Sequence, residues 1–150
     1  MITENGAIEI LNNLIWHDSV LQDIVFVRTN SLDQVKLKVN LLTDSPKYHS
    51  QLAEITFKEC IKVKADMNWG VHCMSEGEMI NSGKAGQDKA EIEKYLDSWN
   101  KREINSFIEF TLDLASTGSS LYLICKEVEL ITVEPDREHN APRPLKIKKE

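Results

Sequence analysis

The chain has 150 residues, of which 41% are hydrophobic and 28% charged, enough for one hydrophobic core but hardly for two. Its longest uncharged apolar run is far shorter than the roughly 18 residues that a membrane span requires. Eighteen Lys and Arg against 24 Asp and Glu give a formal net charge of −6, which disfavours binding to the phosphate backbone of nucleic acids. We therefore expect a soluble globular protein that binds neither membranes nor nucleic acid.

The N-terminal residues predict a short amphipathic helix and no export signal. Thr3 or Asn5 can serve as the N-cap, and apolar residues follow at helical spacing: Ile8, Leu11, Leu14 and Ile15. The segment lacks the basic start and long apolar core of a secretion signal. We therefore expect a cytoplasmic protein.

The three cysteines fit a reducing compartment. Cys60, Cys73 and Cys125 are odd in number and form no CxxC pair, so no disulfide is expected. Cys60 and Cys125 lie in strand-like runs, where a cysteine usually behaves as a small hydrophobic residue.

The string Trp16-His17-Asp18-Ser19 marks the change from helix to strand and predicts a structural corner. The side chains of Asp18 and Ser19 can accept hydrogen bonds from backbone N–H groups in the turn, and His17 can bridge to the helix C-terminus. A role in contacting a ligand is the alternative.

Three strands are expected next. Residues 20–28 are apolar on both faces, residues 35–41 alternate apolar with polar side chains, and residues 53–63 do the same except at Glu59. A Glu on an apolar face indicates a bulge, an edge position or a paired carboxylate more often than a catalytic group.

Residues 66–87 show no sustained period and predict one long irregular loop. Its candidate binding residues are Trp69, Glu76 and Glu78, with Trp69 alternatively a lid over the sheet. A helix should then begin at Asp88, because Glu91 stands three residues on and Ile92, Tyr95, Leu96 and Trp99 recur at helical spacing. Tyr95 and Trp99 are expected to lie on the sheet.

Two further strands, residues 104–114 and 121–133, flank a hairpin loop at 116–119. A parity switch after Cys125 predicts a bulge near Lys126 and Glu127. The element order predicts an α+β fold: a mainly antiparallel sheet of about five strands with two helices packed on one face. We expect one domain over residues 1–134 and a charged, Pro-containing C-terminal tail over residues 135–150.

Residues capable of chemistry are present but show no known spacing. His17, Asp18, His49 and His72, with Cys73, are the candidates for a metal site or a hydrolytic centre. HxH, HExxH and CxxC patterns and a GxSxG elbow are all absent. The sequence predicts no metal, no cofactor and no catalytic residue.

Outward-facing lysines form a basic strip, either paired with acidic residues of neighbouring strands or exposed to an acidic partner: Lys36, Lys38, Lys58, Lys62 and Lys64.

The segment 14–63 resembles a group of small bacterial proteins that includes uncharacterised members and immunity proteins of polymorphic toxin systems. The residues that carry the resemblance are the hydrophobic-His-Asp-Ser opening around Trp16 to Ser19 and the later string Ile55-Thr56-Phe57. The resemblance implies a small intracellular domain whose immunity members bind a toxin, and it assigns no catalytic residues.

The sequence thus favours a non-enzymatic protein-binding domain, an immunity-type antagonist that docks a basic toxin surface through acidic and aromatic residues. One alternative is a small hydrolase or metal-binding enzyme using His17, Asp18, His49 or His72. Another is a self-associating subunit, a homodimer in which an unprotected edge strand pairs across a two-fold axis.

Overall fold

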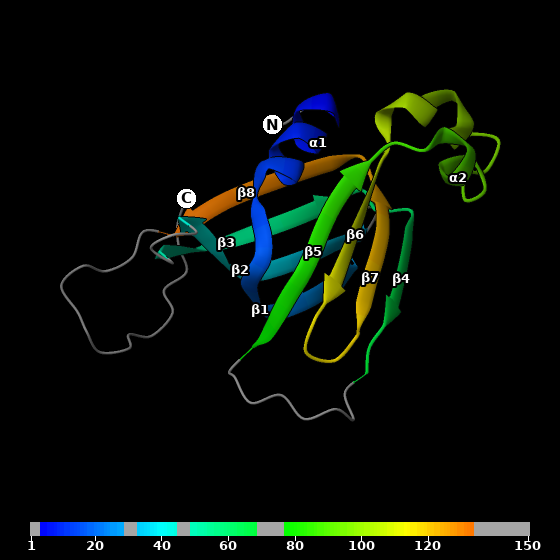
Figure 1. Cartoon of the computed structure of the whole chain (residues 1–150). Coiled ribbons are helices and arrows are strands. Elements are labelled where there is room, and N and C mark those ends of the chain that lie inside the picture. Colours follow the sequence, from blue (N-terminus) through cyan, green and yellow to red (C-terminus); the bar gives the residue numbers. More distant parts are fainter. Residues whose placement is uncertain (1–3, 29–32, 45–48, 69–76, 134–150) are drawn as a thin grey trace.

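The computed structural model describes residues 4–28, 33–44, 49–68 and 77–133 (Figure 1). Its helices are α1 (Glu4–Asn13), α2 (Lys89–Glu93) and the 3₁₀ helix η1 (Asn100–Ser106). Its strands are β1 (Ile15–Arg28), β2 (Asp33–Asp44), β3 (His49–Lys58), β4 (Lys62–Asp66), β5 (Glu78–Gly86), β6 (Ile108–Leu114), β7 (Ser120–Cys125) and β8 (Glu127–Val133). In this part of the chain no helix combines the length and apolar character needed to cross a membrane.

The strands form one sheet in the order β4-β7-β6-β5-β1-β2-β3-β8, and the pairings in it are antiparallel. β4 continues the path of β3, and β8 continues the path of β7. Because β3 pairs with β8 while β4 pairs with β7, the two ends of the sheet meet. Figure 1 shows this closed sheet as two layers, with β5, β6, β7 and β4 running across β1, β2 and β3.

A β-bulge lets the paired strands turn from one layer into the other. Lys58 lies opposite Glu127 and Lys62 lies opposite Ile124, so three residues on one strand face two on the other. Glu59 takes up the extra residue with a φ of 56°. Glu59 therefore interrupts the apolar alternation because the chain bends there. The bulge predicted near Lys126 and Glu127 lies at this same point of the sheet, but the extra residue belongs to the opposite strand.

The core fills the space between the two layers. Its centre is aromatic: the ring of Phe110 lies 5.3 Å from that of Trp16 and 4.9 Å from that of Phe57, measured between centroids. Around these rings pack alternate side chains of the strands, which are fully buried: Leu37, Val39, Ile55, Leu112, Leu121 and Leu123. The alternation predicted for residues 35–41 is thus the alternation of core and outer face. The same holds for the strand predicted over residues 104–114 only from Ile108 onward, because residues 104–106 belong to η1.

Helix α1 packs onto this core at β5. Ala7 and Leu11 are buried members of the core, and the indole N–H of Trp16 donates to the Leu11 carbonyl at 2.7 Å. The side-chain amide of Asn12 bonds the backbone of Ala85 twice: it accepts from the N–H at 2.7 Å and donates to the carbonyl at 2.9 Å. These bonds fix α1 beside β5.

Helices α2 and η1 lie on the opposite, outer face of the sheet. There the side chains of Ile92, Leu96 and Phe107 are buried against Ile124. The neighbours of Ile124 along β7, Leu123 and Cys125, point into the core on the other face. The predicted fold was therefore wrong: eight strands replace the expected five, and the helices do not share one face. Two of the expected strands each bend into a pair, namely β3 with β4 and β7 with β8.

The remaining extra strand is β5, which the sequence placed in the irregular segment 66–87. Apart from Met79 and Ile80 its residues are small or polar, and the Trp16 indole fills the space beside them: a Cβ added to Gly83 would lie 2.5 Å from that ring. The Trp16 side chain from β1 thus takes the place of a large apolar side chain on β5. The sequence of β5 therefore lacks the apolar alternation that would have revealed a strand. The C-terminal tail, residues 135–150, lies outside the described residues.

Candidate functional site

The corner residues form a wide bulge near the start of β1. Ile15 lies opposite Leu42 and Val20 opposite Asn40, so the four residues between them face a single residue of β2. Asp18 adopts a φ of 72° at the turn. Ser19 closes the bulge, because its buried hydroxyl donates to the Ile15 carbonyl at 2.6 Å and accepts from the Leu42 N–H at 2.8 Å.

His17 and Asp18 point away from this bulge into solvent. His17 Nδ1 lies 3.2 Å from Asp18 Oδ2, and the two side chains are 71% and 42% exposed. His49 is exposed at the start of β3, and His72 and Cys73 lie outside the described residues. Within residues 4–28, 33–44, 49–68 and 77–133 no three His, Cys, Asp or Glu side chains converge on a point that could hold a metal.

Of the three predicted binding residues, the structure describes only Glu78, since Trp69 and Glu76 fall outside the described ranges. Glu78 accepts a hydrogen bond from the Thr117 hydroxyl, which lies 2.6 Å from the Ser119 hydroxyl. Ser119 in turn accepts from the Asn68 N–H at 2.8 Å. The Glu78 carboxylate is thus engaged in holding the β6–β7 turn.

The lysine strip is divided between two environments. By register, Lys38 lies between Asp23 and Glu54 of the neighbouring strands. Lys58 forms an ion pair with Glu129 at 3.2 Å. On β4, by contrast, Lys62 and Lys64 lie over the ring of Tyr95, at 5.1 and 5.2 Å from its centroid. Cross-strand pairing and cation–π contacts therefore account for most of the strip.

Among the described residues, the longest stretch outside the strands is residues 87–107 between β5 and β6, which we call the α2–η1 segment. Its first turn forms as the sequence predicts: the Asp88 side chain accepts from the Glu91 N–H at 3.2 Å and caps α2. Lys94 donates to Glu91 at 3.0 Å, and this bond and the Glu91 charge raise the pKa of Lys94. The helix is shorter than predicted, however, because a turn replaces it after Glu93 and η1 follows.

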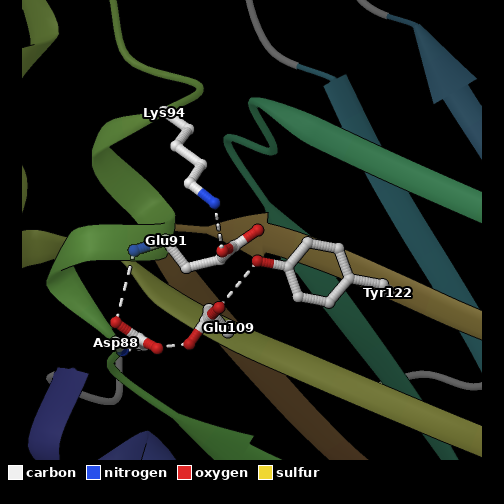
Figure 2. A network of polar contacts seen from close by, with 5 residues as sticks. All are labelled: Asp88, Glu91, Lys94, Glu109 and Tyr122. Atoms are coloured by element: carbon white, nitrogen blue, oxygen red, sulfur yellow. Dashed lines mark hydrogen bonds and ion pairs between the residues drawn. The ribbon is translucent and has the colours of Figure 1, made fainter.

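A polar network ties this segment to the sheet (Figure 2). Glu109 on β6 accepts from the Asp88 N–H at 2.9 Å through one carboxylate oxygen and from the Tyr122 hydroxyl at 2.6 Å through the other. Burial, followed by the bond to Glu109, raises the pKa of Tyr122 far above its ordinary value. Because these bonds join the first turn of the segment to β6 and β7, the network serves as an anchor.

The anchored segment presents one large aromatic side chain to solvent. Trp99 is 72% exposed, and the Arg102 guanidinium lies 5.2 Å from the centre of its ring. The prediction that Trp99 lies on the sheet was wrong, because the helix ends before that position and the chain turns away. Tyr95, in contrast, packs against the small apolar cluster of Ile92, Leu96, Phe107 and Ile124.

Two open hollows lie on the described surface. One, of about 260 Å³, lies beside the corner, between Leu14, Leu42 and Leu130. The other, of about 200 Å³, lies at the bulge of β3 and β4 and is lined by polar side chains that include Glu59 and Lys126. Lys126 there pairs with Glu103 and lies 3.9 Å from Glu59. Neither hollow includes His17, Asp18 or His49.

In comparisons with known proteins, no protein-family model and no curated protein matches this chain.

Proposed function

We propose that the chain is a non-enzymatic protein-binding domain of the bacterial cytoplasm, an immunity-type antagonist of a toxin, and that it docks through the α2–η1 segment. The observation that carries the proposal is a Trp side chain 72% exposed on a segment fixed at both its ends. Trp and Arg are the residues most enriched among those that dominate binding energy, and Trp99 and Arg102 lie together here.

The construction of the segment supports this proposal. Its apolar residues are buried beneath it, the Asp97 carboxylate accepts from the Asn100 N–H at 2.8 Å, and the Asp88 N–H donates to Glu109 of the sheet at 2.9 Å. The exposed ring therefore needs little reordering on binding. Glu93, Asp97 and Glu103 are exposed residues of the same segment, and the whole chain carries a net charge of −6. A toxin with a basic surface is the partner that this charge favours.

The experiment is a paired substitution in the full chain. Trp99→Ala should weaken binding to the toxin encoded beside this gene by about 30-fold, the effect of losing a dominant aromatic contact of roughly 2 kcal/mol. It should also abolish protection when the two proteins are co-expressed. Phe26→Ala removes an aromatic ring that is 56% exposed on β1 and should leave binding unchanged.

Two outcomes would refute the proposal. In one, the neighbouring gene encodes no toxin that this chain binds. In the other, Trp99→Ala binds and protects like the unchanged protein, which would remove the segment as the docking surface.

Self-association is a second candidate, which the exposure of Val25 and Phe26 on β1 favours. β5 pairs with β1 only at Val20 and Leu21, and no strand among the described residues pairs with that edge beyond Leu21. Two copies pairing antiparallel about the midpoint of residues 25 and 26 would bring Asp23 opposite Arg28, an attractive pair. Sedimentation of the unchanged protein and of Phe26→Ala at several concentrations tests this candidate: a dimer weakened by the substitution supports it, and a monomer throughout excludes it.

A further inference from the structure

The two thiols that the structure describes face each other across the bulge between the layers. Cys60 lies in the three-residue stretch between Lys58 and Lys62, and Cys125 lies in the two-residue stretch opposite it, between Ile124 and Glu127. Backbone hydrogen bonds bracket them: the Ile61 N–H donates to the Ile124 carbonyl at 2.9 Å, and the Lys126 N–H to the Lys58 carbonyl at 3.2 Å. The strands on which the thiols lie are therefore held at hydrogen-bonding distance on both sides of the pair.

Both side chains turn toward the same part of the core. Cys125 is fully buried within it, and Cys60 packs against it from the bulge. Interaction with the nearby Cys60 thiol, together with burial, raises the pKa of Cys125 well above its ordinary value. The Cys60 thiol also lies 3.4 Å from the Phe57 carbonyl oxygen.

The two cysteines differ in access to solvent. Cys125 is enclosed, whereas Cys60 is only partly buried and lines the polar hollow of about 200 Å³ that also contains Lys126. A reagent can therefore reach Cys60 first, and Cys125 lies behind it. An accessible thiol backed by a second thiol is the usual arrangement of a cysteine pair that oxidises reversibly.

We propose that Cys60 and Cys125 form a reversible modification site, which a small-molecule disulfide of the glutathione type converts into a disulfide bond across the bulge. This bond would join segment 49–66 to segment 120–133 at the point where both bend from one layer of the closed sheet into the other.

The chemistry proceeds by two exchanges with the oxidant R–S–S–R. First the Cys60 thiol gives up its proton, its sulfur attacks one sulfur of R–S–S–R, and that S–S bond breaks to release R–SH and leave Cys60–S–S–R. The Cys125 thiol then gives up its proton and its sulfur attacks the Cys60 sulfur, which releases the second R–SH. The two protein thiols are oxidised by two electrons, and R–S–S–R is reduced to two thiols.

The test uses the full chain carrying Cys73→Ser, so that only the proposed pair can react, and oxidised glutathione as the probe. We expect both remaining thiols to be lost without attachment of glutathione, digestion to yield one peptide pair joined through Cys60 and Cys125, and dithiothreitol to reverse the change. Closing this long loop should also raise the Tm by roughly 5–10 °C.

Matched variants assign the steps. Cys125→Ala should stop at a stable glutathione adduct on Cys60, and Cys60→Ser should not react, because Cys125 is buried. If Cys125→Ala fails to fold, the peptide map of the Cys73→Ser protein and Cys60→Ser, which alters only the partly buried member, still decide the question. An adduct on Cys60 that never resolves, a disulfide between chains, or no reaction would each overturn the proposal.

Discussion

The closed sheet and the α2–η1 segment are held in place by different forces. In the sheet, apolar side chains from facing layers are fully buried around Trp16, Phe57 and Phe110. The α2–η1 segment rests on a cluster with four buried residues and on hydrogen bonds that converge on Glu109. The sheet should therefore determine whether the protein folds, and the segment should be able to loosen without global unfolding. Four substitutions test this difference, in order of decreasing effect.

The aromatic centre of the sheet should give the largest effect. Phe110→Ala removes a fully buried ring that contacts both Trp16 and Phe57, so we expect it to lower the free energy of unfolding by about 3–5 kcal/mol. Trp99→Ala, at the exposed end of the segment, should change it by less than about 0.5 kcal/mol. Urea titrations of both variants measure the contrast. Equal losses would mean that the segment belongs to the same cooperative unit as the core.

The bulge at Ser19 should give the next largest effect. Ser19→Ala leaves the buried Leu42 N–H without its acceptor, and we expect a loss of about 1–3 kcal/mol. Ser50→Ala, at an exposed position of the adjoining strand β3, is the matched control and should be neutral. A neutral Ser19→Ala would show that the bulge is held by the strands around it.

The close approach of Trp16 to β5 predicts a further loss. Gly83→Ala places a Cβ within 2.7 Å of three atoms of the indole, so the ring must shift, and we expect destabilisation of about 1–2 kcal/mol. Gly86→Ala is the control, because a Cβ there has no atom within 4 Å. In thermal melts, the Tm of Gly83→Ala should therefore fall clearly, whereas the Tm of Gly86→Ala should fall much less or rise.

Loss of the hydrogen bonds that connect the α2–η1 segment to the sheet should have the smallest effect on global stability. Tyr122→Phe removes the bond to Glu109, and we expect a loss of about 1 kcal/mol together with faster amide exchange in residues 88–107. Exchange that stays slow in this segment would show that the apolar cluster alone holds it.

The same variant also changes the response to alkaline pH. The folded state raises the pKa of Tyr122, so the stabilisation is complete below the unfolded value of about 10 and declines as the pH rises above it. The unfolding free energy of the unchanged protein should therefore fall more steeply above pH 10 than that of Tyr122→Phe. Parallel curves would contradict the raised pKa.

The sequence revealed those parts of the fold in which each strand supplies its own apolar side chains. The alternation around Leu37 and Phe110 identified β2 and β6, and the spacing of Asp88 and Glu91 identified the start of α2. β5 escaped notice because an indole from β1 fills the space beside its glycine. The breaks in the apolar alternation at Glu59 and after Cys125 did indicate a bulge. They did not reveal that each strand passes into the other layer of the sheet there, because the apolar runs continue through both positions.

The candidate site was less predictable than the fold for a related reason. Helical spacing placed Tyr95 and Trp99 on one face, but that inference holds only while the helix continues, and α2 ends at Glu93. The exposure of Trp99 depends on where α2 ends, and no single residue in the sequence indicates that the helix ends at Glu93. Glu109 and Tyr122 lie on separate strands, and only the pairing of β6 with β7 brings them together.

The two hydrogen bonds between the Asn12 side chain and the Ala85 backbone allow α1 to protect the edge of β5. A strand end with free N–H and carbonyl groups invites pairing with strands of other molecules, which leads to aggregation. Near Ala85 the side chain of a helical residue supplies the donor and the acceptor that a neighbouring strand would otherwise provide. Deleting the N-terminal residues through Asn12 would thus expose an aggregation-prone strand edge as well as part of the core.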